Sequence, residues 1–467
     1  MSERASGFPR RIGLLLAAVG PGLFLIGYNI GTGSVTTMAE TGSKYGMSLF
    51  WVLVLSCLFT FVMLVAYGRY TLVSGETAMT AYKKHLPLGK FLAIYTIIAL
   101  IVGELAALAG IMGIVSSLIN EWTRFLFGGA GANVILVAVV VIAGCFWLLW
   151  VGKYTLFEKF LTIMVTLMGV SFLISMFIVV ESPAEFMTGL VPGVPKGERA
   201  FINIAAIAGT TCSAMVFIMR SIVVSEKGWK LENLGQEKID ALVSAGTMLL
   251  LSAAVMACAA GAIYHKGLAP VYRAVDMVRT LEPLAGKYAI SIFVVGIIGA
   301  GISTLFPIAL VAPWLICDYR GRERNIRSPL FRWLGGLGLL LGLTVPIFKF
   351  RPVWVMIASQ AFQATILPAI TAAIFFLLNN RRIMGEHKAG WLLNTGLVAT
   401  FAFSIFTSLP GIIDLAGALI EQAAGFGILG RVVIIVLGAV AGIIPCIWLI
   451  TATVKTLFKA GENQSRL

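Results

Sequence analysis

Residues 31–34 read Gly31-Thr32-Gly33-Ser34, and residues 209–213 read Gly209-Thr210-Thr211-Cys212-Ser213. Each stretch interrupts a long apolar segment, and glycine in such a position weakens a helix. The interruptions are alike, since each pairs a Gly-Thr step with small hydroxylated residues, and they lie about 178 positions apart. Close packing of small residues would explain either break by itself. Two breaks at corresponding positions are instead typical of inverted repeats that enclose a site at the bilayer midplane.

The composition excludes a soluble enzyme. Of the 467 residues, 59% are hydrophobic and 12% are charged, whereas soluble domains are roughly 45–50% apolar and 25% charged. The apolar residues are spread along the whole chain, which also excludes disorder and a single membrane anchor. The six cysteines stand singly in apolar segments, without the spacing of a zinc site. We predict an all-α polytopic membrane protein that is not an enzyme and has no cofactor.

Twelve apolar segments are long enough to cross about 30 Å of hydrocarbon. We expect residues 1–467 to form one transmembrane domain, with a first inverted repeat over 13–180, a second over 201–378, and two additional helices over 391–454. The twelve segments are 13–40, 46–70, 91–119, 133–151, 157–180, 201–225, 239–263, 286–316, 330–349, 353–378, 391–410 and 431–454.

The distribution of basic residues predicts the orientation. The chain has 35 Lys and Arg against 21 Asp and Glu, a net charge of +14. An even number of spans places both termini on one side, where 23 of the basic residues lie; 11 lie on the other side, and Arg220 lies within a span. The positive-inside rule then predicts cytoplasmic N- and C-termini in a cell inner membrane. Topology accounts for the basic excess, so we expect the lipid bilayer as a partner and no nucleic acid.

The chemistry of the two breaks limits the ligand. Neither contains Asp, Glu, His or Met, so no carboxylate or thioether is present there to replace the hydration shell of a metal. What remains are two positive helix N-termini and the hydroxyl and backbone groups of the candidate site residues. These residues are Gly31, Thr32, Gly33, Ser34, Gly209, Thr210, Thr211 and Ser213. The set suits a small anion or a neutral polar solute better than a bare divalent cation, and we predict no metal ligand in it.

Two charged residues within the predicted spans are candidates for coupling or gating. Glu104 lies in the middle of 91–119, where a carboxylate is costly, so we predict a proton relay or an ion pair. Arg220 lies near the end of 201–225. It either attracts an anion or pairs with Glu104, or else it extends its guanidinium to the cytoplasmic surface.

A series of short motifs resembles the NRAMP family of divalent metal transporters, which have a LeuT-type fold. The motifs are Gly20-Pro21-Gly22 followed by Gly31-Thr32-Gly33-Ser34, Arg69 to Glu76, Gly103-Glu104-Leu105-Ala106, Gly209-Thr210-Thr211, Gly299-Ala300-Gly301 with Ser303-Thr304, Ser359-Gln360 with Pro368, and Met384-Gly385-Glu386. The resemblance covers nearly the whole chain. It implies a LeuT-type inverted repeat of spans 1–5 and 6–10 with helices 1 and 6 broken. It also adds Gln360, either as an amide in the site or as an interhelical hydrogen bond.

The chain departs from the resembling family at the metal-binding residues. The family's first-helix Asp and Asn fall on Gly31 and Ser34, and its sixth-helix Met-Pro-His falls on Ser213-Ala214-Met215. A further sixth-helix His falls on Arg220, and two acidic positions of the third helix become Ile111 and Ile114. The resemblance therefore implies the fold and a transport function, but not the family's metal ligands or its route for protons.

We expect a secondary transporter of a small inorganic ion, because the sequence contains no ATP-binding motif. A small anion such as bicarbonate is the first expectation, since hydroxyls, backbone N–H groups and helix N-termini can hold an oxyanion. The alternatives are a divalent cation, Mg²⁺ or Mn²⁺, carried with part of its hydration shell, and a neutral or organic solute. From another class, the chain could be a membrane sensor that does not transport. The sequence does not identify a coupling ion.

Overall fold

The structure, a computed structural model, describes residues 31–151, 155–180, 184–196 and 199–423, and these residues form helices without strands. The first half of the described chain contains α3 Thr32–Tyr45, α4 Phe50–Ser74, α5 Ala78–His85, α6 Gly89–Phe127, α7 Val134–Val151, α8 Thr155–Val179, α9 Ala184–Gly189, α10 Ala200–Thr211 and α11 Ala214–Glu226. The second half contains α12 Leu234–Ala259, α13 Glu282–Ala285, α14 Ala289–Ala309, α15 Val311–Arg320, α16 Pro329–Leu341, α17 Thr344–Phe348, α18 Pro352–Ala364, α19 Leu367–Asn379, α20 Arg381–Met384 and α21 Trp391–Ala423. A π-helical turn, Ala260–Tyr264, continues α12, and four 3₁₀ turns lie at Leu231–Asn233, Ala274–Thr280, Gly286–Tyr288 and Gly385–His387.

Nine helical segments of the described chain are long and apolar enough to cross a membrane. They occupy the predicted spans two to four and six to eleven, and α8 occupies the fifth. The prediction of an all-α polytopic membrane fold is therefore confirmed. The first half of the first span, the span predicted over 431–454 and both chain termini lie outside the described residues.

Several spans are discontinuous. The predicted break in the sixth span is present, because α10 ends at Thr211 and α11 begins at Ala214. The sequence did not predict three further breaks, between α14 and α15, α16 and α17, and α18 and α19. Proline explains the last of them, since Pro368 stands in the first turn of α19, where its missing N–H is tolerated.

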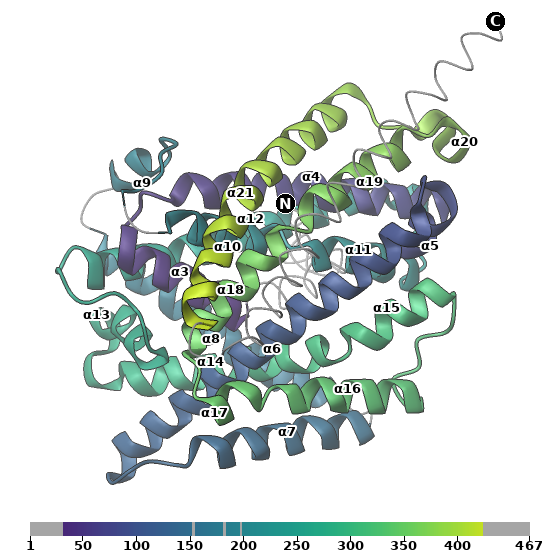
Figure 1. Ribbon diagram of the computed structural model, residues 1–467. Helices are drawn as coiled ribbons and strands as arrows, with labels where there is room; N and C mark the ends of the chain where they lie inside the picture. Colours follow the sequence, from purple (N-terminus) through teal and green to yellow (C-terminus); the bar gives the residue numbers. More distant parts are fainter. Residues whose placement is uncertain (1–30, 152–154, 181–183, 197–198, 424–467) are drawn as a thin grey trace, which may run out of the picture.

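The helices α3, α10 and α18 lie against one another inside the bundle. Figure 1 shows α10 and α18 side by side, with α3 next to them on the side of α9 and α13, and α7 and α16 side by side along one edge. The short helices α9 and α13 lie at one end of the bundle, and α5 and α20 lie at the other end (Figure 1). Loops therefore alternate between two ends, as expected for a chain that crosses a membrane repeatedly.

Helix α3 packs tightly on α12, and α11 is joined to the start of α12 by ion pairs. A Cβ atom on Gly42 of α3 would overlap the backbone carbonyl oxygen of Met256, and Ser34 and Ser252 share a hydrogen bond of 3.2 Å between their hydroxyls. At the opposite end of α12, Arg220 of α11 pairs with Asp240. Helix α12 is thus attached near its start to α11 and in its second half to α3.

Candidate functional site

The backbone between α10 and α11 leaves the helical conformation for two residues. Cys212 has φ −96° and ψ 57°, and Ser213 has φ −73° and ψ 126°. The carbonyl at the end of α10, on Thr211, accepts a hydrogen bond of 2.9 Å from the Thr60 hydroxyl of α4. This donor compensates for a helical partner that the break removes, which a carbonyl at membrane depth requires.

The start of α3 faces two other helices. Gly31 is the N-cap residue and has an extended backbone, with φ −89° and ψ −170°. A Cβ atom there would overlap the Thr304 hydroxyl of α14, and a Cβ on Gly33 would come within 2.9 Å of Gln360 Nε2 on α18. Glycine at these two positions therefore lets α14 and α18 approach the start of the half-helix closely.

A small buried cavity lies where these elements meet. Its volume is about 30 Å³, which is room for one or two waters. Seven of the predicted residues line it, namely Gly31, Gly33, Ser34, Glu104, Thr210, Ser213 and Gln360. The structure therefore brings both breaks, α6 and α18 to one place.

Three predicted residues of the breaks do not line the cavity. Gly209 packs against the backbone of α18, where a Cβ would overlap the Gln360 carbonyl oxygen. The Thr32 hydroxyl lies toward Gly301 of α14, 3.4 Å from where a Cβ on that glycine would stand. The backbone carbonyl of Thr211 serves the helix end, as described above. These residues therefore contact neighbouring helices, and none of them lines the cavity.

Glu104 supplies a carboxylate to the cavity. It is 3% exposed and comes from α6, which passes beside α18. The sequence analysis identified Glu104 as an intramembrane acid with a coupling or gating role and did not count it among the ligands of the two breaks. The argument that the site lacks a carboxylate was therefore wrong, because it considered only the residues within the breaks.

Thr304 and Gln363 also line the cavity, and the sequence analysis did not propose them as ligands. Gln363 lies three positions after Gln360 on α18, and such a spacing places two side chains on one helix face. Its amide oxygen lies 3.4 Å from the Ser213 hydroxyl. The three-residue spacing from Gln360 is the sequence signal that could have identified Gln363.

The cavity offers oxygen ligands. The Gln360 amide nitrogen donates to Met356 Sδ at 3.5 Å. The amide oxygen is then the atom of Gln360 that can act as a ligand. The other polar groups on the wall are hydroxyls, the Gln363 amide and the Glu104 carboxylate. Within the described residues, no three His, Cys, Asp or Glu side chains are grouped so that they could hold a metal ion.

Arg220 lies away from the cavity. It is 0% exposed, pairs with Asp240, and lies 3.1 Å from Glu237 Oε1. The predictions that Arg220 pairs with Glu104 or extends to the cytoplasmic surface are both wrong. Two acidic residues at the start of α12 hold the guanidinium inside the bundle, and the sequence analysis did not connect them with it.

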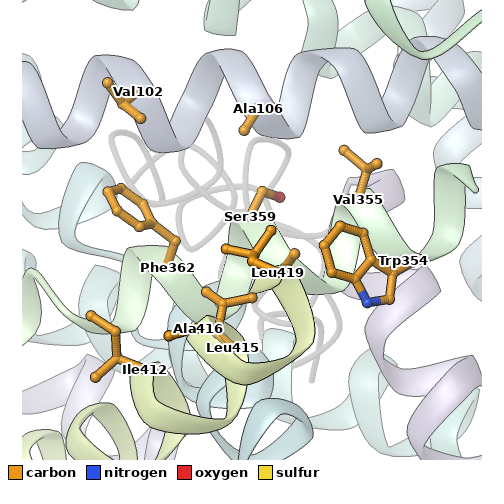
Figure 2. Close-up of a pocket in the computed structure, with 11 residues that line it drawn as sticks. Val102, Ala106, Trp354, Val355, Ser359, Phe362, Ile412, Leu415, Ala416 and Leu419 are labelled. Atoms are coloured by element: carbon orange, nitrogen blue, oxygen red, sulfur yellow. The ribbon is translucent and has the colours of Figure 1, made fainter. Parts of the chain in front are cut away.

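A second cavity on the other side of α18 is apolar. Its volume is about 180 Å³, and Figure 2 shows its walls, which come from α6 (Val102, Ala106), α18 (Trp354, Phe362) and α21 (Leu415, Leu419). The Ser359 hydroxyl at its edge donates to the Met356 carbonyl at 2.8 Å. A cavity with these walls cannot replace the water around an ion. The smaller cavity is therefore the candidate ion site.

The fold and the broken helices define a polytopic transporter with discontinuous helices at a central site. Residues 22–414 match the family of natural resistance-associated macrophage protein-like (Nramp) proteins. The chain belongs to the Nramp family, as its motifs predicted, and it is not an enzyme.

Relatives and solved structures agree with this assignment. The chain is 23% identical to the divalent metal cation transporter MntH of Granulibacter bethesdensis, over 92% of this chain and 94% of that protein. It is 24% identical to MntH of Chromohalobacter salexigens, over 87% of this chain and 94% of that protein. A mutant of the Eremococcus coleocola manganese transporter has a similar fold, with a TM-score of 0.73, 15% identity and 97% of both chains covered. The nucleobase-cation-symport-1 family transporter Mhp1 is a more distant match, with a TM-score of 0.52, 15% identity, and 86% of this chain and 93% of that chain covered.

Proposed function

We propose that this protein is a secondary transporter of a divalent cation of the Mg²⁺ or Mn²⁺ type, bound in the small cavity between α3, α6, α10, α11 and α18. The observation that carries the proposal is the buried Glu104 carboxylate on the cavity wall. A carboxylate oxygen is the kind of ligand that Mg²⁺ and Mn²⁺ prefer in proteins. The relatives named as divalent metal cation transporters support a cation as the cargo.

The ligand types favour a hard cation. Carboxylate, amide and hydroxyl oxygens suit Mg²⁺ and Mn²⁺, whereas thiolate and thioether groups suit softer metals. At Ser213 the chain has a hydroxyl where the Nramp family has a sulfur ligand. At Ser34 it has a hydroxyl where the family has an amide oxygen. We infer that the cation keeps part of its hydration shell, because a single carboxylate and neutral oxygens replace water incompletely.

Bicarbonate, our first expectation from the sequence, loses its main support. That expectation depended on a site without a carboxylate, and Glu104 now faces the same cavity as both breaks. An ionised carboxylate repels an oxyanion at short distance. The positive ends of α3 and α11 still favour an anion, so the experiment must measure both ions.

The test is ion flux into proteoliposomes, with Mn²⁺ and Mg²⁺ entry followed by internal indicators and bicarbonate followed by internal pH. We expect cation entry in the wild type, and a fall of about tenfold or more in Glu104→Gln, the size of loss seen when metal sites lose a supporting group. Glu121→Gln is the matched control, because Glu121 is on the same helix but lines a different cavity near its end.

Three results would contradict the proposal. Bicarbonate movement without metal entry would restore the anion. Unchanged cation entry in Glu104→Gln would remove the carboxylate from the site. Absence of any flux, with binding retained, would favour a sensor.

A further inference from the structure

The loop between α15 and α16 is rich in arginine and lies at the end of the bundle that carries α5 (Figure 1). Between residues 320 and 332 the chain has a single acidic residue, Glu323, and five arginines, namely Arg320, Arg322, Arg324, Arg327 and Arg332. The predicted topology places this loop in the cytoplasm. The proposed transport site gives this concentration of positive charge no role.

Most of these arginines have no acidic partner. Arg324 lies 3.0 Å from Glu226 Oε1 and 3.5 Å from Asp318 Oδ1. In the part of the chain that the structure describes, the other three arginines of the loop, Arg320, Arg322 and Arg327, are exposed and make no ion pair. The loop is therefore a positively charged surface that attracts anions.

Arg332 is held in place by a tryptophan of the neighbouring helix. Its guanidinium carbon lies 4.2 Å from the centre of the Trp150 ring, at the end of α7, and its Nη2 donates to the Trp150 backbone carbonyl at 3.3 Å. Among the described residues, its Nε has no hydrogen-bond partner. The stacked ring fixes the plane of the guanidinium, and a planar guanidinium with donors to spare can bind a phosphate through two parallel hydrogen bonds.

The backbone of the loop is also fixed. Ile326 and Leu330 pack on a hydrophobic cluster formed by Leu148, Leu149, Phe306, Leu310, Cys317 and Phe331. Asn325 Oδ1 accepts a hydrogen bond of 2.9 Å from the Arg327 backbone N–H. Arg327 thus stands between two anchored apolar residues, so a ligand that binds it pays little to order the loop.

An exposed apolar surface begins beside these arginines. Trp150 is 54% exposed and Trp333, next to Arg332, is 75% exposed. Trp147 on α7 and Leu337 and Leu340 on α16 continue the exposed surface away from the loop, and the two helices lie side by side (Figure 1). Tryptophan is typical of the level of lipid headgroups. The arginines therefore lie at the end of a surface that suits acyl chains.

We propose that Arg327, Arg332, Trp150 and Trp333, here named the arginine–tryptophan surface, bind an anionic phospholipid of the cytoplasmic leaflet. Arg327 and Arg332 hold the phosphate, and the acyl chains lie along α7 and α16. Charge complementarity selects an anionic lipid, because the headgroup of a zwitterionic lipid carries a cation of its own that the arginines repel. The inference goes beyond the proposed transport function and does not depend on the cargo.

The first experiment compares two lipids and two arginines. The full chain in detergent is titrated with phosphatidylglycerol or phosphatidylcholine, and native mass spectrometry measures the fraction with lipid bound. We expect phosphatidylglycerol to bind about tenfold or more tightly, and Arg327→Gln to weaken its binding about fivefold. Arg382→Gln is the matched control and should change neither affinity, because Arg382 is exposed at the same end of the bundle but on α20, away from α7 (Figure 1).

The second experiment separates a built site from charge alone. Arg332→Lys keeps the charge but lacks the planar group, and Trp150→Leu keeps every charge but removes the stacked ring. We expect both variants to lose most of the preference for phosphatidylglycerol. The melting temperature without added lipid checks that they fold, and Trp150→Leu should pass this check because more than half of its side chain is exposed.

Four results would overturn the proposal. The first is equal binding of the two lipids by the wild type, and the second is equal weakening by Arg327→Gln and Arg382→Gln. Full preference for phosphatidylglycerol in both Arg332→Lys and Trp150→Leu would leave only the general attraction of a basic loop. Displacement of phosphatidylglycerol by an equal concentration of inorganic phosphate would show that the ligand is a free anion. None of these measurements uses ion flux, so a failure of the proposed cargo would not affect them.

Discussion

Two glycines, Gly209 and Gly33, face α18, but a Cβ atom added at each would contact different kinds of atom. A Cβ on Gly209 would overlap the backbone carbonyl oxygen of Gln360, which cannot move without the helix. We expect Gly209→Ala to lower the free energy of unfolding by about 1–3 kcal/mol, the usual cost of overpacking. The measurement is thermal unfolding of the purified protein in detergent.

Gly33→Ala should behave differently. Its Cβ would stand 2.9 Å from Gln360 Nε2 and 3.3 Å from Met356 Sδ, the ends of two flexible side chains. We expect a melting temperature closer to the wild type, together with slower ion uptake because Gln360 is displaced from the cavity wall. Equal melting temperatures for the two alanine variants would contradict this comparison.

The candidate site could be predicted in part from single residues. The sequence predicted the break in the sixth span, because glycine beside hydroxyl side chains marks an interrupted helix, but only Cys212 and Ser213 leave the helical conformation there. Thr32, Gly33 and Ser34, which were predicted as a break, lie in the first turn of α3, and the residues before Gly31 lie outside the described ones.

The sequence did not predict that Glu104 and Thr304 face those breaks, because that depends on how α6 and α14 pack. Arg220 shows the same limit, since its partners Glu237 and Asp240 belong to the next helix.

The turn between α4 and α5 contains an ion cluster outside the membrane spans. Glu76 lies 2.7 Å from Lys84 Nζ and 2.8 Å from His85 Nε2. Burial raises the pKa of the Glu76 carboxyl, but the hydrogen bonds and charges of Lys84 and His85 outweigh it, so the pKa falls below its usual 4.5. The ionised carboxylate therefore stabilises the folded turn.

The sign of this shift predicts the pH dependence of α5. Because the folded pKa lies below the unfolded one, the contribution is complete above pH 4.5 and is lost as the pH falls through the folded value. We expect the protection of α5 amides, corrected for intrinsic exchange, to decrease as the pH falls below about 4.5, and Glu76→Gln to remove that decrease. The same acid response in the variant would show that another group is responsible.

The end of α10 depends on a donor from a different helix. The Thr60 hydroxyl is shared between two carbonyls, that of Ser56 in its own helix at 2.7 Å and that of Thr211 at 2.9 Å. Valine has nearly the same shape without the donor. We expect Thr60→Val to lower the free energy of unfolding by about 1–3 kcal/mol, because a buried carbonyl loses its partner.

Thr96→Val is the control for that experiment. The Thr96 hydroxyl is equally buried, but it donates only to the Leu92 carbonyl of its own helix, at 2.8 Å. Its loss should cost less than the loss of the Thr60 hydroxyl, as chemical denaturation of both variants would measure. A larger loss in Thr96→Val would contradict the role given to Thr60.

The orientation in the membrane is predicted from the basic residues in the loops at the two ends of the bundle. Arg322 and Lys266 are both exposed, and the predicted topology places Arg322 in the cytoplasm and Lys266 outside. In intact cells, a membrane-impermeant maleimide should label Lys266→Cys and not Arg322→Cys. The five native cysteines of the described residues are buried, so they give little background. The reverse labelling would contradict cytoplasmic termini.

Much of the fold was predictable because a span of about 20 apolar residues is a strong signal. Nine predicted spans are confirmed as helices long enough to cross a membrane. The breaks after α14, α16 and α18 were not predicted, because proline and glycine also occur within continuous membrane helices. The inverted repeats over 13–180 and 201–378 stay a prediction.

The attachment of α12 has a mechanical consequence. Helix α3 is fastened to it at Ser252 and Met256, and α11 is fastened to it at Glu237 and Asp240. Fifteen residues separate Glu237 from Ser252, about 22 Å along the helix axis. If α12 tilts about its middle, these two ends swing in opposite directions and carry the two half-helices with them. Helix α12 then acts as a lever, so that opening the path on one side of the membrane closes it on the other.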